Sequence, residues 1–121
     1  MKIRVMFVCL GNICRSPLGH GLFLAQVAER GLSDQFDVAS SGTSAYHAGE
    51  PPDPGSVRVA RDVGIDISGQ RSQHVTAADL EHYDYVVAMD RSNQRDLLRI
   101  DPTKEHKIHL MRIFQAAPDS L

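Results

Sequence analysis

Short apolar runs recur along the chain, separated by longer segments with helical spacing. The runs cover residues 3–8, 36–41, 85–89 and 107–111. The third run reads YVVAM and is rich in β-branched residues, which favours a buried strand. Strands that alternate with helices predict a three-layer α/β fold, in which a four-stranded parallel sheet is flanked by helices on both faces.

The helices between these strands are predicted by their starts and stops. The first has Ser16 as its N-cap and Pro17 at its first helical position, and Gly31 ends it. Its buried face is predicted from apolar residues at helical spacing, which are Leu18, Leu22, Ala25 and Ala28. Later helices are predicted to follow the capping residues Asp53, Thr76 and Asp90.

Composition and charge exclude several classes of protein. The chain has 121 residues, 42% of them hydrophobic and 23% charged, which suits one globular domain over residues 1–121. A formal net charge of −2 gives no reason to expect nucleic acid or an anionic membrane as a partner. No apolar run approaches the ~20 residues that cross a bilayer, and no signal-peptide pattern is present. We therefore predict a cytoplasmic protein.

Cysteine usage argues against a metal centre. Cys9 and Cys14 are the two cysteines of the sequence, too few for a secreted disulfide scaffold. They also fall short of a four-ligand zinc site, and His106 and His109 have no spacing that would complete one. We expect neither a metal nor a cofactor.

The segment from Cys9 to Arg15 has the features of an anion-binding loop. It follows the first predicted strand, contains Gly11 and leads directly into a helix. In a parallel sheet, ligands lie beyond the carboxyl ends of the strands. Backbone N–H groups and the helix N-terminus attract an anion there, and the guanidinium of Arg15 matches two phosphate oxygens. The segment is therefore predicted to hold phosphate or sulfate.

Such a loop also gives Cys9 a chemical role. A thiol beside a helix N-terminus and an arginine ionises easily, and the thiolate is then a nucleophile. In-line attack on a bound phosphoester would give a cysteinyl-phosphate that water hydrolyses. Asn12 is predicted to lock the loop, and Ser16 to donate a hydrogen bond to the sulfur.

A structural alternative exists for each of these residues. A free cysteine is commonly a buried, inert side chain, and Arg15 alone would be an ordinary surface residue. Cys14 is either a small loop residue or a partner that forms a disulfide with an oxidised Cys9. Tyr46 is either a loop aromatic that covers the sheet edge or part of a binding site. The inert reading leaves unexplained why Cys, Gly, Asn, Arg and Ser occur together at a strand-to-helix turn.

The stretch VCLGNICRSP resembles the phosphate-binding loop of the low molecular weight protein tyrosine phosphatases. That family's pattern is cysteine, five residues, arginine, then serine or threonine. VASSGTSAYHAGEPPDP and DYVVAMDRSNQRDL resemble further family segments, so the likeness covers nearly the whole chain. It implies the phosphatase-I-like fold with flavodoxin-like winding. It also implies hydrolysis of protein phosphotyrosine and small aryl phosphates without a cofactor, by a monomer or weak dimer.

The resemblance also implies roles for individual residues. Cys9 matches the nucleophile and Arg15 the phosphate clamp. Tyr46 matches an aromatic residue at the rim of the site. The remaining positions form the substrate-binding loop or support it through a polar network, and they are Leu10, Gly11, Asn12, Ile13, Cys14, Ser16 and Ser40.

Three departures from the family pattern stand out. Gln70 occupies a position where the family often has histidine, and Gly19 and Gly21 stand where relatives usually carry other residues. The family's general acid is an aspartate in an Asp-Pro-Tyr or Asp-Pro-Trp segment after the fourth strand, whereas Asp101-Pro102 precedes that strand here. We therefore expect the sequence to lack the acid loop and the last helix. Asp119 is the nearest carboxylate, but its neighbours do not fit the pattern.

Two other functions remain open at this point. Thiol-dependent arsenate reductases share the loop, but they need further cysteines, and none follows Cys14. A relative that acts on phosphoarginine typically has threonine where this chain has Ile13, so Ile13 favours the tyrosine enzyme. The second alternative is a catalytically weak module that binds phosphate or phosphoproteins.

Overall fold

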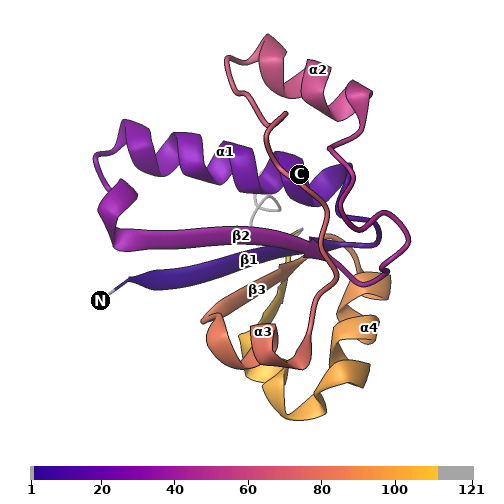
Figure 1. Cartoon of the computed structure of the whole chain (residues 1–121). Coiled ribbons are helices and arrows are strands. Elements are labelled where there is room, and N and C mark those ends of the chain that lie inside the picture. Colours follow the sequence, from indigo (N-terminus) through magenta and orange to yellow (C-terminus); the bar gives the residue numbers. More distant parts are fainter. Residues whose placement is uncertain (1, 112–121) are drawn as a thin grey trace, which may run out of the picture.

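The computed structural model describes residues 2–111, and its centre is a four-stranded sheet (Figure 1). The strands are β1 (Ile3–Cys9), β2 (Phe36–Gly42), β3 (Tyr85–Ala88) and β4 (Ile108–Leu110). They are all parallel and lie in the order β2-β1-β3-β4. The predicted four-stranded parallel sheet is confirmed.

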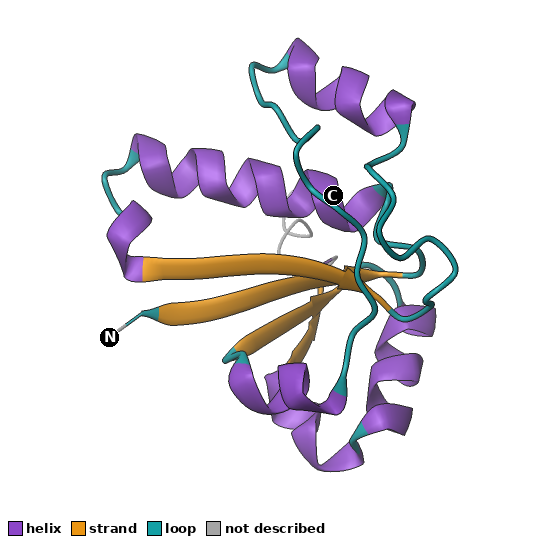
Figure 2. Cartoon of the chain, in the orientation of Figure 1, coloured by secondary structure: helices purple, strands orange, loops and turns teal. Residues whose placement is uncertain are grey.

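Helices cover both faces of this sheet (Figure 2). They are α1 (Arg15–Glu29), α2 (Pro54–Asp62), α3 (Ala77–His82) and α4 (Arg91–Ile100). α1 packs on one face and α2 packs against α1, whereas α3 and α4 lie on the other side. Two 3-10 helices, Ser33–Gln35 and Pro102–Lys107, were not predicted from the sequence pattern. Within residues 2–111, no helix has the length and apolar character that crossing a membrane requires.

Alternate residues of β1 supply the two hydrophobic cores. Met6 and Val8 point into the core beneath α3 and α4, where Leu80 and Leu97 are also fully buried. Phe7 points to the opposite face and packs with its neighbours there against α1. This period of two is the geometry of a strand that is buried on both faces. Each such side chain contributes about 1.5–3 kcal/mol when it leaves water.

The predicted start of the first helix is wrong by two residues. α1 begins at Arg15, and Cys14 occupies the N-cap position without a side-chain capping bond. Ser16 is instead fully buried, and its hydroxyl bonds with Asn12 and Cys9 rather than with the helix backbone. The side chain of this serine therefore interacts with the loop before the helix and does not cap the helix.

The predicted apolar face of α1 is also wrong. Its fully buried positions are Ser16, Pro17, Gly19, Gly21 and Val27, whereas Leu22, Ala25 and Ala28 are exposed. A Cβ added at Gly21 would lie 2.6 Å from the Ile67 side chain, and one at Gly19 would lie 3.1 Å from Phe7. The two glycines form the face of the helix that packs closely against Phe7 and Ile67. Because glycine has no side chain, this buried face gives no hydrophobic pattern in the sequence. Close packing offsets the ~1 kcal/mol that each glycine costs a helix.

The remaining helix boundaries agree with the sequence. Asp53 accepts hydrogen bonds from two backbone N–H groups at the start of α2, and Asp90 accepts one at the start of α4. Thr76 caps α3 in a reciprocal capping box with Asp79. Gly31 and Gly64 follow α1 and α2 with φ of 70° and 81°, a left-handed conformation that favours glycine.

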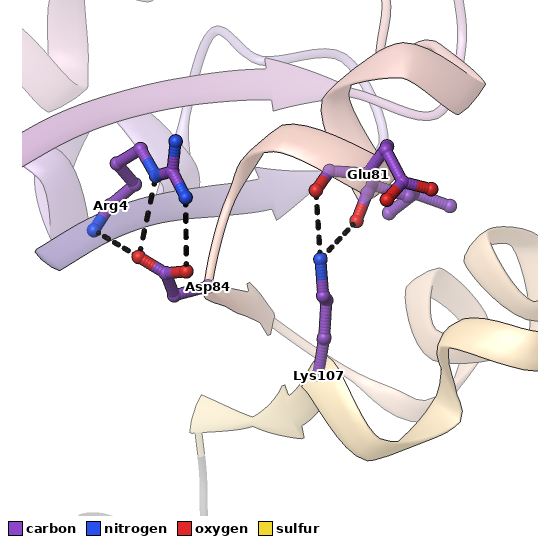
Figure 3. A network of polar contacts seen from close by, with 5 residues as sticks. Arg4, Glu81, Asp84 and Lys107 are labelled. Carbon is purple, nitrogen blue, oxygen red and sulfur yellow. Dashed lines mark hydrogen bonds and ion pairs between the residues drawn. The ribbon is translucent and has the colours of Figure 1, made fainter.

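Charged side chains fasten the end of the sheet where the strands begin (Figure 3). The carboxylate of Asp84 accepts from the backbone N–H of Arg4 at 2.9 Å and from its guanidinium at 3.4 Å. The ammonium of Lys107 donates to the carbonyls of Leu80 and Glu81 at 3.1 and 2.9 Å. The loops that form the site lie at the opposite end of the sheet, where the strands end.

Candidate active site

The sulfur of Cys9 lies at the bottom of the loop that joins β1 to α1. The residue is buried, with 3% of its surface exposed. The backbone N–H of Asn12 donates to the sulfur at 3.2 Å, and the hydroxyl of Ser16 lies 3.1 Å from it. Two polar groups thus contact the sulfur at the carboxyl end of β1.

Asn12 locks the loop that carries these groups. Its φ of 56° is the left-handed conformation, which asparagine tolerates better than most residues. Its side-chain N–H donates to the Ser16 hydroxyl at 2.8 Å, and its side-chain oxygen accepts from the backbone N–H of Gln73 at 2.9 Å. The predicted polar network therefore includes Asn12 and Ser16, with Gln73 as a partner that the sequence did not indicate.

The backbone of the loop is held from outside. Four of its carbonyls accept hydrogen bonds from surrounding segments, and the pairs are Cys9–Thr43 at 3.0 Å, Leu10–Ser44 at 2.9 Å, Gly11–Ser72 at 2.8 Å and Ile13–Asp53 at 2.7 Å. A trans peptide points its C=O and the following N–H in opposite directions. The N–H groups after these carbonyls therefore point away from the surrounding segments, and that of Asn12 donates to the sulfur. This is the arrangement that binds an anion.

Gly42 allows the loop to lie this close to β2. It is the register partner of Cys9, at the ends of the two strands. A Cβ added to Gly42 would lie 2.7 Å from the carbonyl oxygen of Leu10. Any larger residue would push the loop outward and spread its N–H groups.

Arg15 begins α1 and is fixed from its outer side. Its guanidinium is half-exposed and donates to the carboxylate of Asp90 at 3.0 Å. The same carboxylate accepts from the backbone N–H of Asn93 at 2.9 Å. That N–H, and then the Arg15 guanidinium, hold the pKa of Asp90 below its usual range. A charged Asp90 therefore orients the arginine at the rim of the site.

A cavity of about 550 Å³ opens above the sulfur. Its lining includes Cys9 and Arg15 together with Leu10, Gly11, Ile13, Cys14, Ser44, Tyr46 and His47. Most predicted substrate-binding positions are thus brought together, and Asn12 and Ser16 lie buried behind the loop. Ser44 and His47 were missed, because they lie in an irregular segment without periodicity. Within residues 2–111 no carboxylate lines this cavity. Asp119 lies outside the described residues.

Ser40, predicted to support the loop, belongs to a polar network beside it. Its hydroxyl bonds with the imidazole Nδ1 of His20 and with the side-chain oxygen of Gln70, both at 3.3 Å. Gln70 in turn donates to the Pro17 carbonyl at 3.1 Å, so the glutamine ties this network to the first turn of α1. Burial lowers the pKa of His20. Ser40 is also tied to the loop through Gln73, whose side chain donates to the Ser40 carbonyl at 2.9 Å and whose backbone N–H donates to Asn12.

Cys14 lies on the exposed side of the loop. Partial burial raises the pKa of this thiol, and the carboxylate of Asp53 and the neighbouring Cys9 raise it further. Within residues 2–111, no cluster of histidine, cysteine or carboxylate side chains is placed to hold a metal ion. The cavity above the loop brings together a buried cysteine and an arginine, the pair of groups that defines the cysteine-dependent phosphatases.

Comparisons with known proteins agree with this class. The profile of the low molecular weight phosphotyrosine protein phosphatase family matches residues 4–120. The low molecular weight protein-tyrosine-phosphatase YfkJ of Bacillus subtilis is 36% identical over 118 residues, which are 98% of this chain and 75% of that protein. The low molecular weight phosphotyrosine protein phosphatase of Schizosaccharomyces pombe is 42% identical over 102 residues, 84% of this chain and 65% of that protein. The chain belongs to this family of enzymes.

Solved structures show the same fold. The crystal structure of YfkJ from Bacillus subtilis superposes with a TM-score of 0.90 at 35% identity, covering 94% of this chain and 72% of that one. Vibrio vulnificus Wzb in complex with benzylphosphonate superposes with a TM-score of 0.82 at 28% identity, covering 95% and 78%. The resemblance seen in the sequence, and the fold that it implied, are confirmed.

Proposed function

We propose that this protein hydrolyses phosphotyrosine in proteins, and small aryl phosphates, through a cysteinyl-phosphate on Cys9. The observation that carries the proposal is the position of the Cys9 sulfur. It lies at the bottom of the cavity, 3.2 Å from the Asn12 nitrogen and 3.1 Å from the Ser16 hydroxyl, with Arg15 on the cavity wall. The proposed nucleophile and the proposed phosphate clamp thus lie at the two ends of one loop.

The first step transfers the phosphoryl group to sulfur. The N–H groups of the loop and the Arg15 guanidinium bind the phosphate oxygens and stabilise the charge that develops in the transition state. The Cys9 thiolate attacks phosphorus in line, so that a sulfur–phosphorus bond forms as the bond to the phenolic oxygen breaks. The departing phenolate takes up a proton, and we assign its donor to none of residues 2–111.

The second step returns the free enzyme. Water attacks phosphorus, the sulfur–phosphorus bond breaks and inorganic phosphate leaves. The leaving group is now the Cys9 thiolate, and the Ser16 hydroxyl at 3.1 Å stabilises it by donating a hydrogen bond. Asn12 supports this donation, because its side-chain N–H donates to the serine oxygen at 2.8 Å and takes one of its two lone pairs.

The depth of the site supports an aryl substrate. Cys9 is 3% exposed at the bottom, whereas Tyr46 on the cavity wall is 84% exposed. A phosphotyrosine side chain spans such a depth with a flat ring that can stack on Tyr46. A relative with this fold was solved with benzylphosphonate, which joins a phenyl ring to a phosphonate. The proposal therefore includes a tyrosine-phosphorylated protein as partner, phosphate or sulfate as competing anions, and action in the cytoplasm.

Steady-state kinetics test the function. We expect turnover of p-nitrophenyl phosphate and of a phosphotyrosine peptide, competitive inhibition by inorganic phosphate and much slower turnover of the matched phosphoserine peptide. A phosphate-binding module without catalysis would bind the phosphopeptide but release no phosphate. Thiol-dependent reduction of arsenate without phosphatase activity would instead support the alternative of an arsenate reductase.

A further inference from the structure

The aromatic ring of Tyr46 stands almost free in solvent at the mouth of the cavity. The residue is 84% exposed. Within residues 2–111, its side chain has one ring contact, with His47, at a centroid distance of 4.8 Å and an interplanar angle of 82°. An exposed tyrosine ring otherwise spreads over several rotamers. Its orientation therefore depends on the histidine beside it.

His47 has neighbours on two sides of its ring. Its Nδ1 lies 3.0 Å from a carboxylate oxygen of Glu50. An ionised carboxylate only accepts hydrogen bonds, so this nitrogen carries a proton and donates it. The other edge of the ring lies over the phosphate loop, because a Cβ added at Gly11 would lie 3.0 Å from Cδ2 of His47. The imidazole thus lies between a carboxylate and the loop.

The backbone of this segment adds little freedom. The N–H of Tyr46 donates to the Ser44 hydroxyl at 3.1 Å, and the N–H of Glu50 donates to the His47 carbonyl at 2.9 Å. Gly49 donates to the Ser72 carbonyl at 2.7 Å. With the turn fixed, the torsions of the Tyr46 side chain are the main freedom left at the rim.

We propose that His47 is a positioning residue, which sets the Tyr46 ring for the aryl group of the substrate while Glu50 holds the imidazole. The inference rests on the proposed phosphatase function. It adds a structural reason why that enzyme would prefer substrates with an aryl group. A tyrosine held in place loses less rotamer freedom when a substrate ring stacks on it. His47 therefore acts on the binding of the aryl group and not on the phosphate or the sulfur.

The test is His47→Ala, measured with p-nitrophenyl phosphate and a phosphotyrosine peptide. Loss of an aromatic pair predicts a rise in KM of about three- to tenfold, with kcat and the inhibition constant of inorganic phosphate unchanged. His82→Ala is the matched control, because the His82 and Tyr83 rings have the same 4.8 Å separation and an 88° angle at the end of α3. That variant should keep the parent's KM.

A double-mutant cycle separates positioning of Tyr46 from direct contact with the substrate. If His47 acts through Tyr46, His47→Ala should add nothing to the KM of Tyr46→Ala. An equal rise in KM in both backgrounds overturns the inference, and so does an unchanged KM in His47→Ala. A parallel loss of phosphate inhibition also overturns it, because His47 would then act on the loop. A parent protein without aryl phosphatase activity contradicts the proposed function itself, which the cycle does not address.

Discussion

The guanidinium of Arg15 donates to the carboxylate of Asp90 across 3.0 Å, although the two residues belong to different helix starts. Arg15 is the first residue of α1, and Asp90 is the N-cap of α4. One carboxylate therefore caps a helix and holds the arginine that is proposed to clamp phosphate. The position of the Arg15 guanidinium therefore depends on the segment after β3, which carries Asp90, as well as on the loop between Cys9 and Arg15.

Substitutions of Asp90 can separate these two tasks. Asp90→Asn keeps an oxygen that caps α4 but loses the charge that holds Arg15. We expect weaker competitive inhibition by inorganic phosphate and little change in the free energy of unfolding. Asp90→Ala should weaken inhibition to a similar extent and also cost about 0.5–2 kcal/mol of stability through the lost cap. Phosphate inhibition equal to the parent's in both variants would mean that Asp90 does not position the arginine.

The close packing of Gly21 in α1 against Ile67 predicts the effect of adding a methyl group at this position. Gly21→Ala should destabilise the protein by about 1–3 kcal/mol, because the new Cβ would lie 2.6 Å from the side chain of Ile67. Helix propensity alone predicts the opposite, a gain of about 1 kcal/mol. Gly19→Ala, with its nearest contact at 3.1 Å, should have a smaller effect. Urea unfolding measures both, and a Gly21→Ala variant as stable as the parent would contradict the packing described here.

The lowered pKa of Asp84 predicts how the free energy of unfolding depends on pH. The backbone N–H of Arg4, and then its guanidinium, hold the pKa of Asp84 below its usual range. A carboxyl whose pKa is lowered by folding stabilises the protein above its unfolded pKa of about 3.9, and this contribution is lost as pH falls through the folded value. Asp84→Asn should therefore reduce stability at neutral pH but not below the folded value. Asp34→Asn, which removes no hydrogen bond within residues 2–111, is the control for urea unfolding across this range. A parent–variant difference that does not shrink in acid would exclude this role.

Cys14 gives a prediction for oxidation. Peroxide converts the Cys9 thiolate to a sulfenic acid, which a nearby thiol can trap as a disulfide before irreversible oxidation. Cys14 lies in the same loop, five residues after Cys9 and on its exposed side. After peroxide and then dithiothreitol, the parent should regain its activity, whereas Cys14→Ser should recover poorly. Peptide mass mapping should show the Cys9–Cys14 peptide lighter by two hydrogens. Equal recovery of the two proteins would show that Cys14 does not protect Cys9.

Local signals in the sequence predicted the elements that depend on nearby residues. The capping residues Asp53, Thr76 and Asp90 were found because their side chains bond to backbone groups two or three residues away. The phosphate loop was found because its chemistry lies in one short segment between Cys9 and Ser16. The strands β1 and β3 were found from apolar runs that are buried on both faces of the sheet.

The features that were missed depend on distant parts of the chain. The buried face of α1 is set by Gly19 and Gly21, whose lack of a side chain gives no hydrophobic period. His47 enters the cavity because the segment after β2 is bonded to the phosphate loop, a contact that no local pattern encodes. The part of Gln73 in the network likewise depends on its bond to Asn12 from 61 positions away.

Trapping of the phosphoenzyme tests the central claim most directly. The protein is mixed with a phosphotyrosine substrate, quenched in acid within a turnover and analysed by intact mass and peptide fragmentation. We predict one phosphoryl group on sulfur at Cys9 in the parent. Cys9→Ser should give no phosphoenzyme and no hydrolysis, while it still binds inorganic phosphate. A phosphoryl group on any other residue, or hydrolysis by Cys9→Ser near the parent rate, would contradict the assignment of Cys9 as the nucleophile.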